Sequence, residues 1–505
     1  MINSKNYPLV QLLERGTGTF IKGNSSSLSY DKLRTVILKI GGQLATLGIQ
    51  SGDSIGIVTP NGPEAATIFI AVASFATAAP LNPSYTKDEF KFYLQDLDAK
   101  LLIVLEDQPS ESIVAAQELS IEVVKIRTQF LPGEITLTNN SEILDPAPSS
   151  FNAAQDIGLV LHTSGTTSRP KIVPLSVDNI CVSARNIART LKLIDSDCYL
   201  NIMPLFHIHG LIAGVLTTLE SGGSMFCSYG FDALKFFNLL NDVKPTWFSA
   251  VPTMHQAILS RAPRNKDIIE KADLKFIRSS SASLPINVLE NLESVFKCPV
   301  IEAYGMTEAS HQMASNPLPP LKRKPGTVGL AAGPEIAILS DDKKILGNNK
   351  IGEIVIRGAN VTKGYRNNIK ANEESFSKGW FRTGDQGLID SFGYLTIKGR
   401  LKEIINRGGE KISPKEIDEI LLSHPNVAEA VTFSIKHAKL GEDIGAALVL
   451  IDNQKTTEKD LQEYLKKKIA VFKIPRKILF LDELPKGSTG KVQRLGLAEK
   501  LGIIK

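Results

Sequence analysis

The sequence predicts an α/β protein: a large N-terminal domain of doubly wound sheets with a small β-barrel-like part, then a smaller α+β domain. Three observations indicate this: the 505-residue length, alternating helical and strand-like segments near the N-terminus, and a change to short strands near Gly326. Such a length exceeds one ordinary core, so two or more domains are expected. We expect the large domain at 1–398 and the small domain at 403–505, joined by the segment 399–402.

The first 150 residues alternate helices and strands. Apolar residues at helical spacing predict a helix over Leu28–Leu47, and a short strand follows at Ser54–Val58. The uncharged segment Ala65–Leu81 predicts a buried helix through Ala78 rather than a membrane span, because it is short and rich in Ala, Ser and Thr. Lys100–Val104 is expected to be a buried strand. This alternation is typical of parallel sheets covered on both faces.

Later segments predict the remaining elements. A strand at Gln155–His162 leads into a Gly/Thr/Ser loop, and a helix follows near Val177–Leu191. Short strands with glycine-rich turns then favour a small barrel or antiparallel sheet, with strands at Glu335–Leu339, Gly352–Arg357 and Leu395–Lys398. The small domain is expected to hold helices at Pro414–Ser423 and Glu458–Ile469, and strands at Val427–Ile435, Ala446–Leu450 and Lys477–Leu481.

Composition excludes several classes of protein. The 58 basic and 53 acidic residues give a net charge of +5 with no block of like charge, which suits small anions better than nucleic acid. The four cysteines are far apart and form no C-x-x-C pair, so we expect neither a disulfide framework nor a cysteine metal site. With no signal peptide, peroxisomal address or membrane span expected, we predict a cytoplasmic monomer or homodimer.

The strongest local signal is a loop of small hydroxyl residues after an apolar strand. Backbone N–H groups and hydroxyls there can bind a phosphate chain, and a lysine adds positive charge. The loop is not the common G-x-x-x-x-G-K-[ST] P-loop. A flexible surface turn is the alternative. The residues expected to contact phosphate are Thr163, Ser164, Gly165, Thr166, Thr167 and Lys171.

This loop resembles the signature of the adenylate-forming superfamily, which includes acyl-CoA synthetases, adenylation domains of peptide synthetases and firefly luciferase. Four further segments resemble its other motifs in family order: Tyr304–Glu308, Trp380–Asp385, Gly399–Glu403 and Pro485–Lys491. The resemblance covers nearly the whole chain. It implies an acid–thiol ligase that uses ATP, Mg²⁺ and coenzyme A, forms an acyl-adenylate, and releases AMP and pyrophosphate.

The resemblance gives the residues of the Tyr304 segment individual roles. Tyr304 and Gly305 are expected to contact adenine, and Thr307 to donate to the α-phosphate. Glu308 offers the carboxylate oxygen that Mg²⁺ prefers, with Thr167 as a further candidate ligand. Outside such a motif, a tyrosine is more often a core residue and a glutamate a solvated one.

The later motifs supply the ribose and catalytic residues. Asp385 is expected to accept hydrogen bonds from the ribose hydroxyls, and Arg400 to hold ribose or phosphate from the other side. A turn aspartate and a surface arginine are the ordinary alternatives. Lys491 is expected to meet the negative charge that develops during adenylation.

The same resemblance implies a hinge at 399–402 and a mobile small domain at 403–505, which rotates between the two half-reactions. Lys402 matches the hinge residue. After rotation, the turn with Gly408, Gly409 and Lys411 is expected to lie beside the adenylate and leave room for the pantetheine arm of CoA.

The acid is indicated by the residues expected around its acyl group. Amino-acid-activating relatives carry an Asp where this chain has His207, so amino acids are disfavoured. Ser281 and His311 add polar groups, and Ser281 with Ala282 is also expected to contact the nucleotide. An apolar acyl tail would leave such donors unpaired at about 1–3 kcal/mol each, whereas a second carboxylate would accept from His207, Ser281 and His311.

These segments resemble the oxalate–CoA ligase branch most, with Gly305 where a small residue such as Ala is expected. Oxalate is therefore the expected acid. The alternatives are another small, aromatic or fatty acid, a carrier protein in place of CoA, a luciferase-like oxygenase and a non-catalytic nucleotide binder. His311 is alternatively a hydrogen-bonded helix-end residue, and His207 and His209 alternatively gate the site or orient the adenylate; His207 is also a catalytic candidate.

Overall fold

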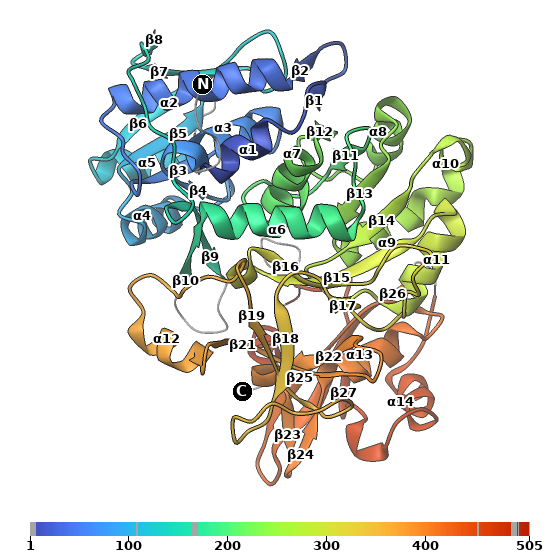
Figure 1. Ribbon diagram of the computed structural model, residues 1–505. Coiled ribbons are helices and arrows are strands. Elements are labelled where there is room, and N and C mark those ends of the chain that lie inside the picture. Colours follow the sequence, from blue (N-terminus) through green and yellow to red (C-terminus); the bar gives the residue numbers. More distant parts are fainter. Residues whose placement is uncertain are drawn as a thin grey trace.

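The computed structural model describes residues 7–107, 110–163, 170–451, 454–485, 492 and 494–503. The strands in these residues form four sheets of nine, eight, five and five strands. Figure 1 shows the blue and green elements of the two larger sheets above the yellow to red elements of the two smaller ones, with α6 (Val177–Thr190) lying between the blue and green regions. The chain therefore separates into a large first part and a smaller last part.

The eight-stranded sheet has a parallel centre that is covered on both faces. Its strand order is β10 (Lys171–Ser176), β9 (Ile157–Thr163), β4 (Thr77–Pro80), β3 (Ser54–Val58), β5 (Leu101–Leu105), β6 (Glu122–Thr128), β7 (Ile135–Asn139) and β8 (Glu142–Ile143). The covering helices are α2 (Tyr30–Thr46) and α3 (Pro63–Phe75) on one face, and α4 (Lys87–Asp96) and α5 (Glu111–Glu118) on the other. In β5, Leu101 and Ile103 join the core of α2 and α3, whereas Leu102 and Val104 join that of α4 and α5. Alternate residues face opposite sides of a strand, so this all-apolar strand needs helices on both faces.

The uncharged segment near residue 70 contains a helix and then a strand, so the prediction of one helix through Ala78 was wrong beyond Phe75. After Ala76 the chain forms β4, which pairs in parallel with β3 and β9. Alanine has high helix propensity, and the sequence alone does not show that two neighbouring strands lie within reach of this backbone. No helix in the described ranges is both long enough and apolar enough to cross a membrane.

The nine-stranded sheet supplies the edge where the predicted acid residues and the Tyr304–Glu308 segment lie. Its order is β17 (Leu330–Ala331), β16 (His311–Ser315), β15 (Val300–Met306), β14 (Phe276–Ser279), β13 (Trp247–Ala250), β11 (Cys198–Asn201), β12 (Ser224–Cys227), β1 (Thr19–Lys22) and β2 (Ser27–Ser29). One face packs on α8 (Phe236–Val243), α9 (Pro252–Arg261), α10 (Lys266–Lys271) and α11 (Ile286–Phe296). The pairs from β12 through β15 are parallel, and ligands of such sheets bind beyond the carboxyl ends of the strands.

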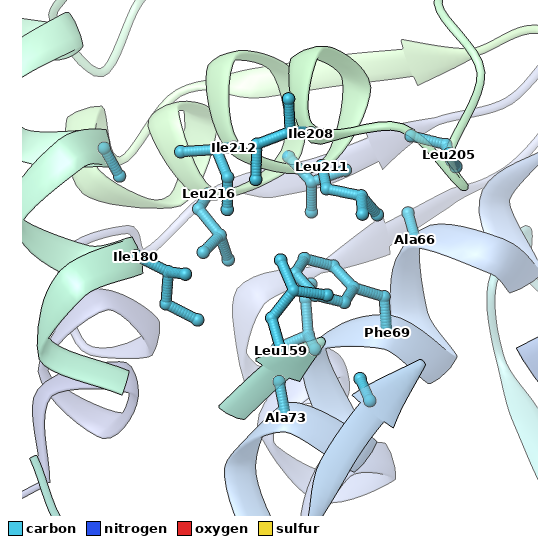
Figure 2. Packing of buried hydrophobic residues seen from close by; sticks show 14 of the residues in the cluster. Ala66, Phe69, Ala73, Leu159, Ile180, Leu205, Ile208, Leu211, Ile212 and Leu216 are labelled. Carbon is cyan, nitrogen blue, oxygen red and sulfur yellow. The ribbon is translucent and has the colours of Figure 1, made fainter. Parts of the chain in front are cut away.

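The two large sheets are joined by a shared apolar core. Figure 2 shows side chains from α3, α6, β9 and the π-helical segment η2 (His209–Leu216) converging there. The labelled residues are Ala66, Phe69, Ala73, Leu159, Ile180, Leu205, Ile208, Leu211, Ile212 and Leu216. Because η2 begins at His209, this packing also fixes the position of the histidine. π-Helical turns occur frequently at functional sites.

The third sheet is antiparallel and has five strands. They are β18 (Glu335–Leu339), β19 (Gly352–Arg357), β21 (Trp380–Ile389), β20 (Phe376–Ser377) and β22 (Leu395–Arg400), which pairs with β21. Further helical segments in the described residues are α1 (Pro8–Leu13), α7 (Thr217–Ser221), α12 (Ile369–Ser375), α15 (Leu497–Lys500), η3 (Ala262–Arg264), η4 (Thr307–Ala309) and η6 (Val471–Lys473).

The fourth sheet has its own apolar cores. Its strands are β24 (Glu410–Ile412), β23 (Ile405–Arg407), β26 (Gly441–Leu450), β25 (Val427–His437) and β27 (Lys477–Phe480). The sheet packs with α13 (Pro414–Leu422) and α14 (Glu458–Lys466). The predicted hinge at 399–402 spans the end of β22 and the start of the short turn η5 (Leu401–Glu403), between the third and fourth sheets. The boundaries 1–398 and 403–505 remain our proposal for the two domains.

Candidate active site

Three predicted nucleotide residues that are far apart in the sequence meet beside β15. The Tyr304 hydroxyl donates a hydrogen bond to Asp385 Oδ2. Arg400 Nη1 lies 3.0 Å from Asp385 Oδ1 and donates to the Thr383 carbonyl over 2.8 Å. The structure therefore brings the residues expected at adenine and ribose into one hydrogen-bonded cluster.

Burial controls the protonation of this cluster. It raises the pKa of the Tyr304 phenol well above its usual range, and the Asp385 carboxylate raises it further. Burial is the largest single effect on Arg400 and opposes its charge, but the combined attraction to Asp385 and its other acidic neighbours outweighs burial, and the pKa of the guanidinium is raised. Both groups therefore remain donors, and together they fix the orientation of the carboxylate between them.

A second cluster surrounds Glu308, which lies in η4 and is 7% exposed. The Tyr365 hydroxyl donates to Glu308 Oε1 over 2.9 Å, and Lys171 Nζ lies 4.4 Å from the centre of the Tyr365 ring. Tyr365 was not predicted from the sequence, because an isolated tyrosine after Gly364 forms no pattern of its own. It connects the predicted metal residue to the predicted phosphate residue Lys171.

Positive charge is concentrated near Lys171. Burial lowers the pKa of its ammonium group, Lys402 and Arg400 lower it further, and Glu308 opposes the shift. A polyphosphate placed here would relieve the repulsion among these cations, because an anion favours their charged forms.

The Ser/Thr loop itself is only partly described. Thr163, at the end of β9, is paired in register with Lys171, at the start of β10, so the two ends of the loop lie side by side. Thr307 begins the η4 turn and is half-buried. The other predicted residues of the loop and of catalysis, Ser164, Gly165, Thr166, Thr167 and Lys491, lie outside the described residues.

The predicted acid residues gather around His209. Its Nδ1 lies 3.0 Å from Ser281 Oγ, and its ring meets the His311 ring edge-on with 4.8 Å between the ring centres. The His209 backbone N–H donates to His207 Nδ1 over 3.3 Å. The structure therefore brings His207, Ser281 and His311 to one place, and His209, which was left without a definite role, lies between them. Ala282 follows Ser281 and is exposed.

Gly305 is required by the position of His311. A Cβ atom at Gly305 would lie 2.2 Å from the His311 carbonyl oxygen and 2.5 Å from its Nδ1. In this chain glycine therefore fits this position better than the alanine expected from the resemblance, because a methyl group would overlap the strand that carries His311.

The backbone at two predicted acid residues is in the left-handed region. Ser281 has φ +72° and His311 has φ +96°. Such conformations cost on the order of 1–3 kcal/mol for residues other than glycine and are concentrated at functional sites. The surrounding fold holds both side chains in place despite this cost.

The predicted CoA residues lie elsewhere in this conformation. Gly408 and Gly409 form the exposed turn between β23 and β24, and Lys411 follows in β24. The Gly408 N–H donates to the carbonyl of Leu440, between β25 and β26, and the Gly409 N–H donates to Asn406 Oδ1 in β23. Figure 1 shows β23 and β24 at the far end of that sheet, away from β15 and β16. Lys402 is exposed and lies in η5.

Comparison with known proteins identifies the family. The model of the AMP-binding enzyme family matches residues 13–366, and the model of the AMP-binding enzyme C-terminal domain matches residues 416–491. The first match alone covers more than half of the 505 residues. This protein therefore belongs to the AMP-binding enzyme family.

Individual relatives are similar over almost their full length. An oxalate–CoA ligase of Arabidopsis thaliana is 43% identical over 480 residues, which cover 94% of this chain and 93% of that protein. An oxalate–CoA ligase of Saccharomyces cerevisiae is 44% identical over 88% of this chain and 86% of its own length. The crystal structure of ATP-bound MatB from Rhodopseudomonas palustris has a TM-score of 0.89 at 27% identity, over 98% of this chain and 99% of that chain.

These similarities test the predictions at the level of the family. They confirm the resemblance to the adenylate-forming superfamily and the predicted fold class. They also confirm the enzyme class, an AMP-forming acid–CoA ligase that uses ATP, CoA and a small carboxylic acid. The roles of individual site residues remain predictions.

Proposed function

We propose that this enzyme joins oxalate to CoA through an oxalyl-adenylate. In the first step an oxygen of one oxalate carboxylate attacks the α-phosphorus of ATP. A P–O bond forms while the bond to pyrophosphate breaks, and pyrophosphate leaves. In the second step the CoA sulfur attacks the activated acyl carbon and loses its proton, a C–S bond forms while the C–O bond to AMP breaks, and AMP leaves.

The polar wall around His209 is the observation that carries the choice of oxalate. Ser281 and His311 both lie against this histidine, so the wall offers polar rather than apolar contacts to an acyl group. His207 Nδ1 accepts a backbone N–H, so the neutral ring carries its proton on Nε2 and is a donor there. A second carboxylate would accept from such donors. The two relatives described above, both oxalate–CoA ligases, support the same acid.

The nucleotide would lie along the two clusters near β15. We assign Tyr304 and Gly305 to adenine, Asp385 to ribose, and Arg400 to ribose or phosphate. Tyr304 and Asp385 are already joined by a hydrogen bond, so their geometry needs little change when ATP binds.

Thr307 and Lys171 would contact the phosphates, together with the hydroxyl loop that follows Thr163. Lys491 would meet the charge that develops at the α-phosphate and on the leaving pyrophosphate. After rotation at Lys402, the turn with Gly408, Gly409 and Lys411 would accommodate CoA.

Glu308 is our candidate ligand for Mg²⁺. The described residues contain no group of three or more His, Cys, Asp or Glu side chains suited to a metal ion. A single carboxylate fits Mg²⁺ nonetheless, because this ion is commonly held by one or two carboxylates, substrate phosphates and water. When bound, Mg²⁺ would neutralise charge on the phosphates. The Tyr365 hydroxyl would hold the Glu308 carboxylate in one orientation, and Thr167 remains a further candidate ligand.

The test is to measure AMP, pyrophosphate and thioester formation from ATP and CoA with oxalate, malonate, acetate, a medium-chain fatty acid and 4-coumarate. We expect the highest kcat/KM with oxalate and no ADP. Lys491→Met should slow adenylation by about a hundredfold or more, and Lys466→Met, at an exposed lysine of α14 that pairs with Glu463, is the matched control. A better acid in the panel would refute oxalate and leave the reaction class intact, whereas ADP without AMP would refute the reaction.

Thioester formation with free CoA, without any added protein, would also exclude an obligatory carrier protein. The cytoplasmic location and the monomeric or homodimeric state remain proposals from the sequence.

A further inference from the structure

A buried arginine lies directly behind the proposed acyl site. Arg278 belongs to β14 and is fully buried. Its Nη1 lies 3.4 Å from both His209 Nε2 and Ser249 Oγ, and its Nη2 donates to Gln312 Oε1 over 3.3 Å. Throughout the part of the chain that the structure describes, no acidic side chain forms an ion pair with Arg278, and its Nε has no hydrogen-bond partner.

An enclosed cation without a counter-charge is strongly unfavourable. Burial lowers the pKa of Arg278 to about 10, which leaves the guanidinium positive at neutral pH. A fold that keeps such a charge next to a binding site holds a positive potential there. In a water-poor interior that potential acts on a neighbouring anion more strongly than a surface charge does.

The hydrogen bonds around Arg278 have one consistent direction. A guanidinium only donates, so the Ser249 oxygen accepts from Arg278 and the Ser249 hydroxyl is free to donate elsewhere. Its partner is His209 Nε2, at 2.6 Å. With Nε2 an acceptor, the neutral His209 ring carries its proton on Nδ1 and donates it to Ser281 Oγ.

This chain of hydrogen bonds ends at Ser281, which we assign to the acyl site. The Ser281 oxygen accepts from His209, so its own hydrogen points away from that ring and is available to an acceptor on a bound acid. Arg278 therefore sets the direction of each donor in turn, from Ser249 through His209 to Ser281. Such an arrangement stabilises an anionic hydrogen-bond acceptor more than a neutral one.

We propose that Arg278, acting through Ser249 and His209, is a positioning residue that makes this enzyme select acids with a second negative charge. Ser281 touches the distal carboxylate of the acid, and Arg278 orients the Ser281 hydroxyl and supplies the positive potential behind it. The proposal rests on the proposed function and adds the origin of its charge selectivity.

A purely structural role is the competing explanation. Gln312, the other partner of Arg278, donates to Thr190 Oγ1 and to the Ala332 carbonyl, so Arg278 also helps to tie β14 to β16 and α6. Loss of that connection would weaken binding of any acid. Loss of the hydrogen-bond chain from Arg278 to Ser281 would instead weaken binding of acids with a second negative charge only.

The decisive experiment compares oxalate with oxamate, in which a neutral amide replaces the second carboxylate at nearly the same size. The variants are Arg278→Met, Arg278→Lys and Ser249→Ala. Arg323→Met is the matched control, because Arg323 pairs with Glu293 at 2.8 Å away from the site. The readouts are kcat and KM for each acid, KM for ATP, and the melting temperature.

We expect Arg278→Met to lower kcat/KM for oxalate about a hundredfold, mainly through KM, and that for oxamate by less than about threefold. Ser249→Ala should lower kcat/KM for oxalate about tenfold. Arg278→Lys should recover part of the preference, because it keeps the charge, and KM for ATP should not change in any variant. Arg323→Met should leave both acids unchanged.

Equal losses for both acids, or an unchanged preference for oxalate, would overturn the role of Arg278. If Arg278→Met does not fold, Ser249→Ala and Arg278→Lys test the proposal instead. The quantity compared is again the ratio of kcat/KM for oxalate to kcat/KM for oxamate. A wild-type enzyme without a preference for oxalate over oxamate would refute the proposed function itself, whereas a wild-type preference that survives in the variants would refute only the present inference.

Discussion

Tyr304 donates its phenolic hydrogen to Asp385, across 81 positions of sequence, and thereby joins β15 of the largest sheet to β21 of the third sheet. The ring that we assign to adenine and the carboxylate that we assign to ribose are therefore one rigid unit. Arg400 holds the second oxygen of the same carboxylate. Nucleotide binding should depend on the contacts among these three residues as well as on their contacts with ATP.

Tyr304→Phe tests this connection, because it keeps the ring and removes only the hydroxyl. A hydrogen bond to a charged group contributes about 1.5–3 kcal/mol. We expect KM for ATP to rise about tenfold while kcat changes little, since the freed Asp385 carboxylate can turn away from ribose. Steady-state kinetics with varied ATP gives the answer.

The control for Tyr304→Phe is Tyr394→Phe, at an exposed hydroxyl that donates to the Lys322 carbonyl away from the site. It should leave KM for ATP within about twofold. Equal KM values for ATP in the two variants would contradict the proposed rigid unit.

Tyr365→Phe should raise the Mg²⁺ concentration needed for half-maximal activity. The Tyr365 hydroxyl orients Glu308, and the loss of such a supporting hydrogen bond typically weakens metal binding by about 10–100-fold. The ring stays in place below Lys171, so KM for the acid should be unaffected. Pyrophosphate release at varied Mg²⁺ and saturating ATP measures the effect.

Tyr30→Phe is the matched control, because it removes a buried hydroxyl that donates to the Gly223 carbonyl over 2.8 Å. It should lower stability without changing the Mg²⁺ requirement. If the two variants shift the Mg²⁺ dependence alike, Tyr365 has no special connection to the metal.

Gly305→Ala should disturb the acid site from within the sheet. Its methyl group would meet the His311 carbonyl at 2.2 Å, and relief of that overlap must move the start of β16. We expect a stability loss of about 1–3 kcal/mol and a drop in kcat/KM for oxalate of more than about tenfold. Chemical denaturation and AMP release measure the two effects.

Gly347→Ala provides the comparison, because a Cβ atom there would meet no atom within 4 Å. It should leave both the stability and kcat/KM unchanged. An active and stable Gly305→Ala enzyme would show that His311 does not need its present position.

Much of the fold is encoded locally. The expected strands Glu335–Leu339 and Gly352–Arg357 agree with β18 and β19 at both ends, because alternating apolar residues are bounded there by turn residues. The transition from α3 to β4 was missed, because Ala78 becomes a strand residue only through pairing with β3 and β9.

The site was predictable only where it forms continuous motifs. Tyr304 and Asp385 were found because their neighbours in the sequence carry the signal. Arg278, Ser249 and Tyr365 were missed, because each is an ordinary residue of a strand or turn in the sequence and acquires a role only through neighbours in space. Local patterns hold no information about such contacts.

Glu302 makes the stability of the folded protein depend on pH. It lies in β15, is 4% exposed, and accepts the Leu284 backbone N–H over 3.0 Å. Burial raises its pKa from 4.5 to about 7; nearby Lys415 opposes this and Glu419 reinforces it. Between these two pH values the folded state retains a proton that the unfolded chain releases. Stability should therefore fall as pH rises through this window and stay reduced above it.

Glu302→Gln keeps an oxygen acceptor for Leu284 and removes the titration. We expect the variant to exceed the wild type in free energy of unfolding by up to about 3 kcal/mol near pH 8, with the advantage disappearing toward about pH 4.5. Urea denaturation across this range measures it, with Glu335→Gln, at an exposed glutamate, as the control. A difference that does not vary with pH would show that Glu302 is ionised in the folded protein throughout.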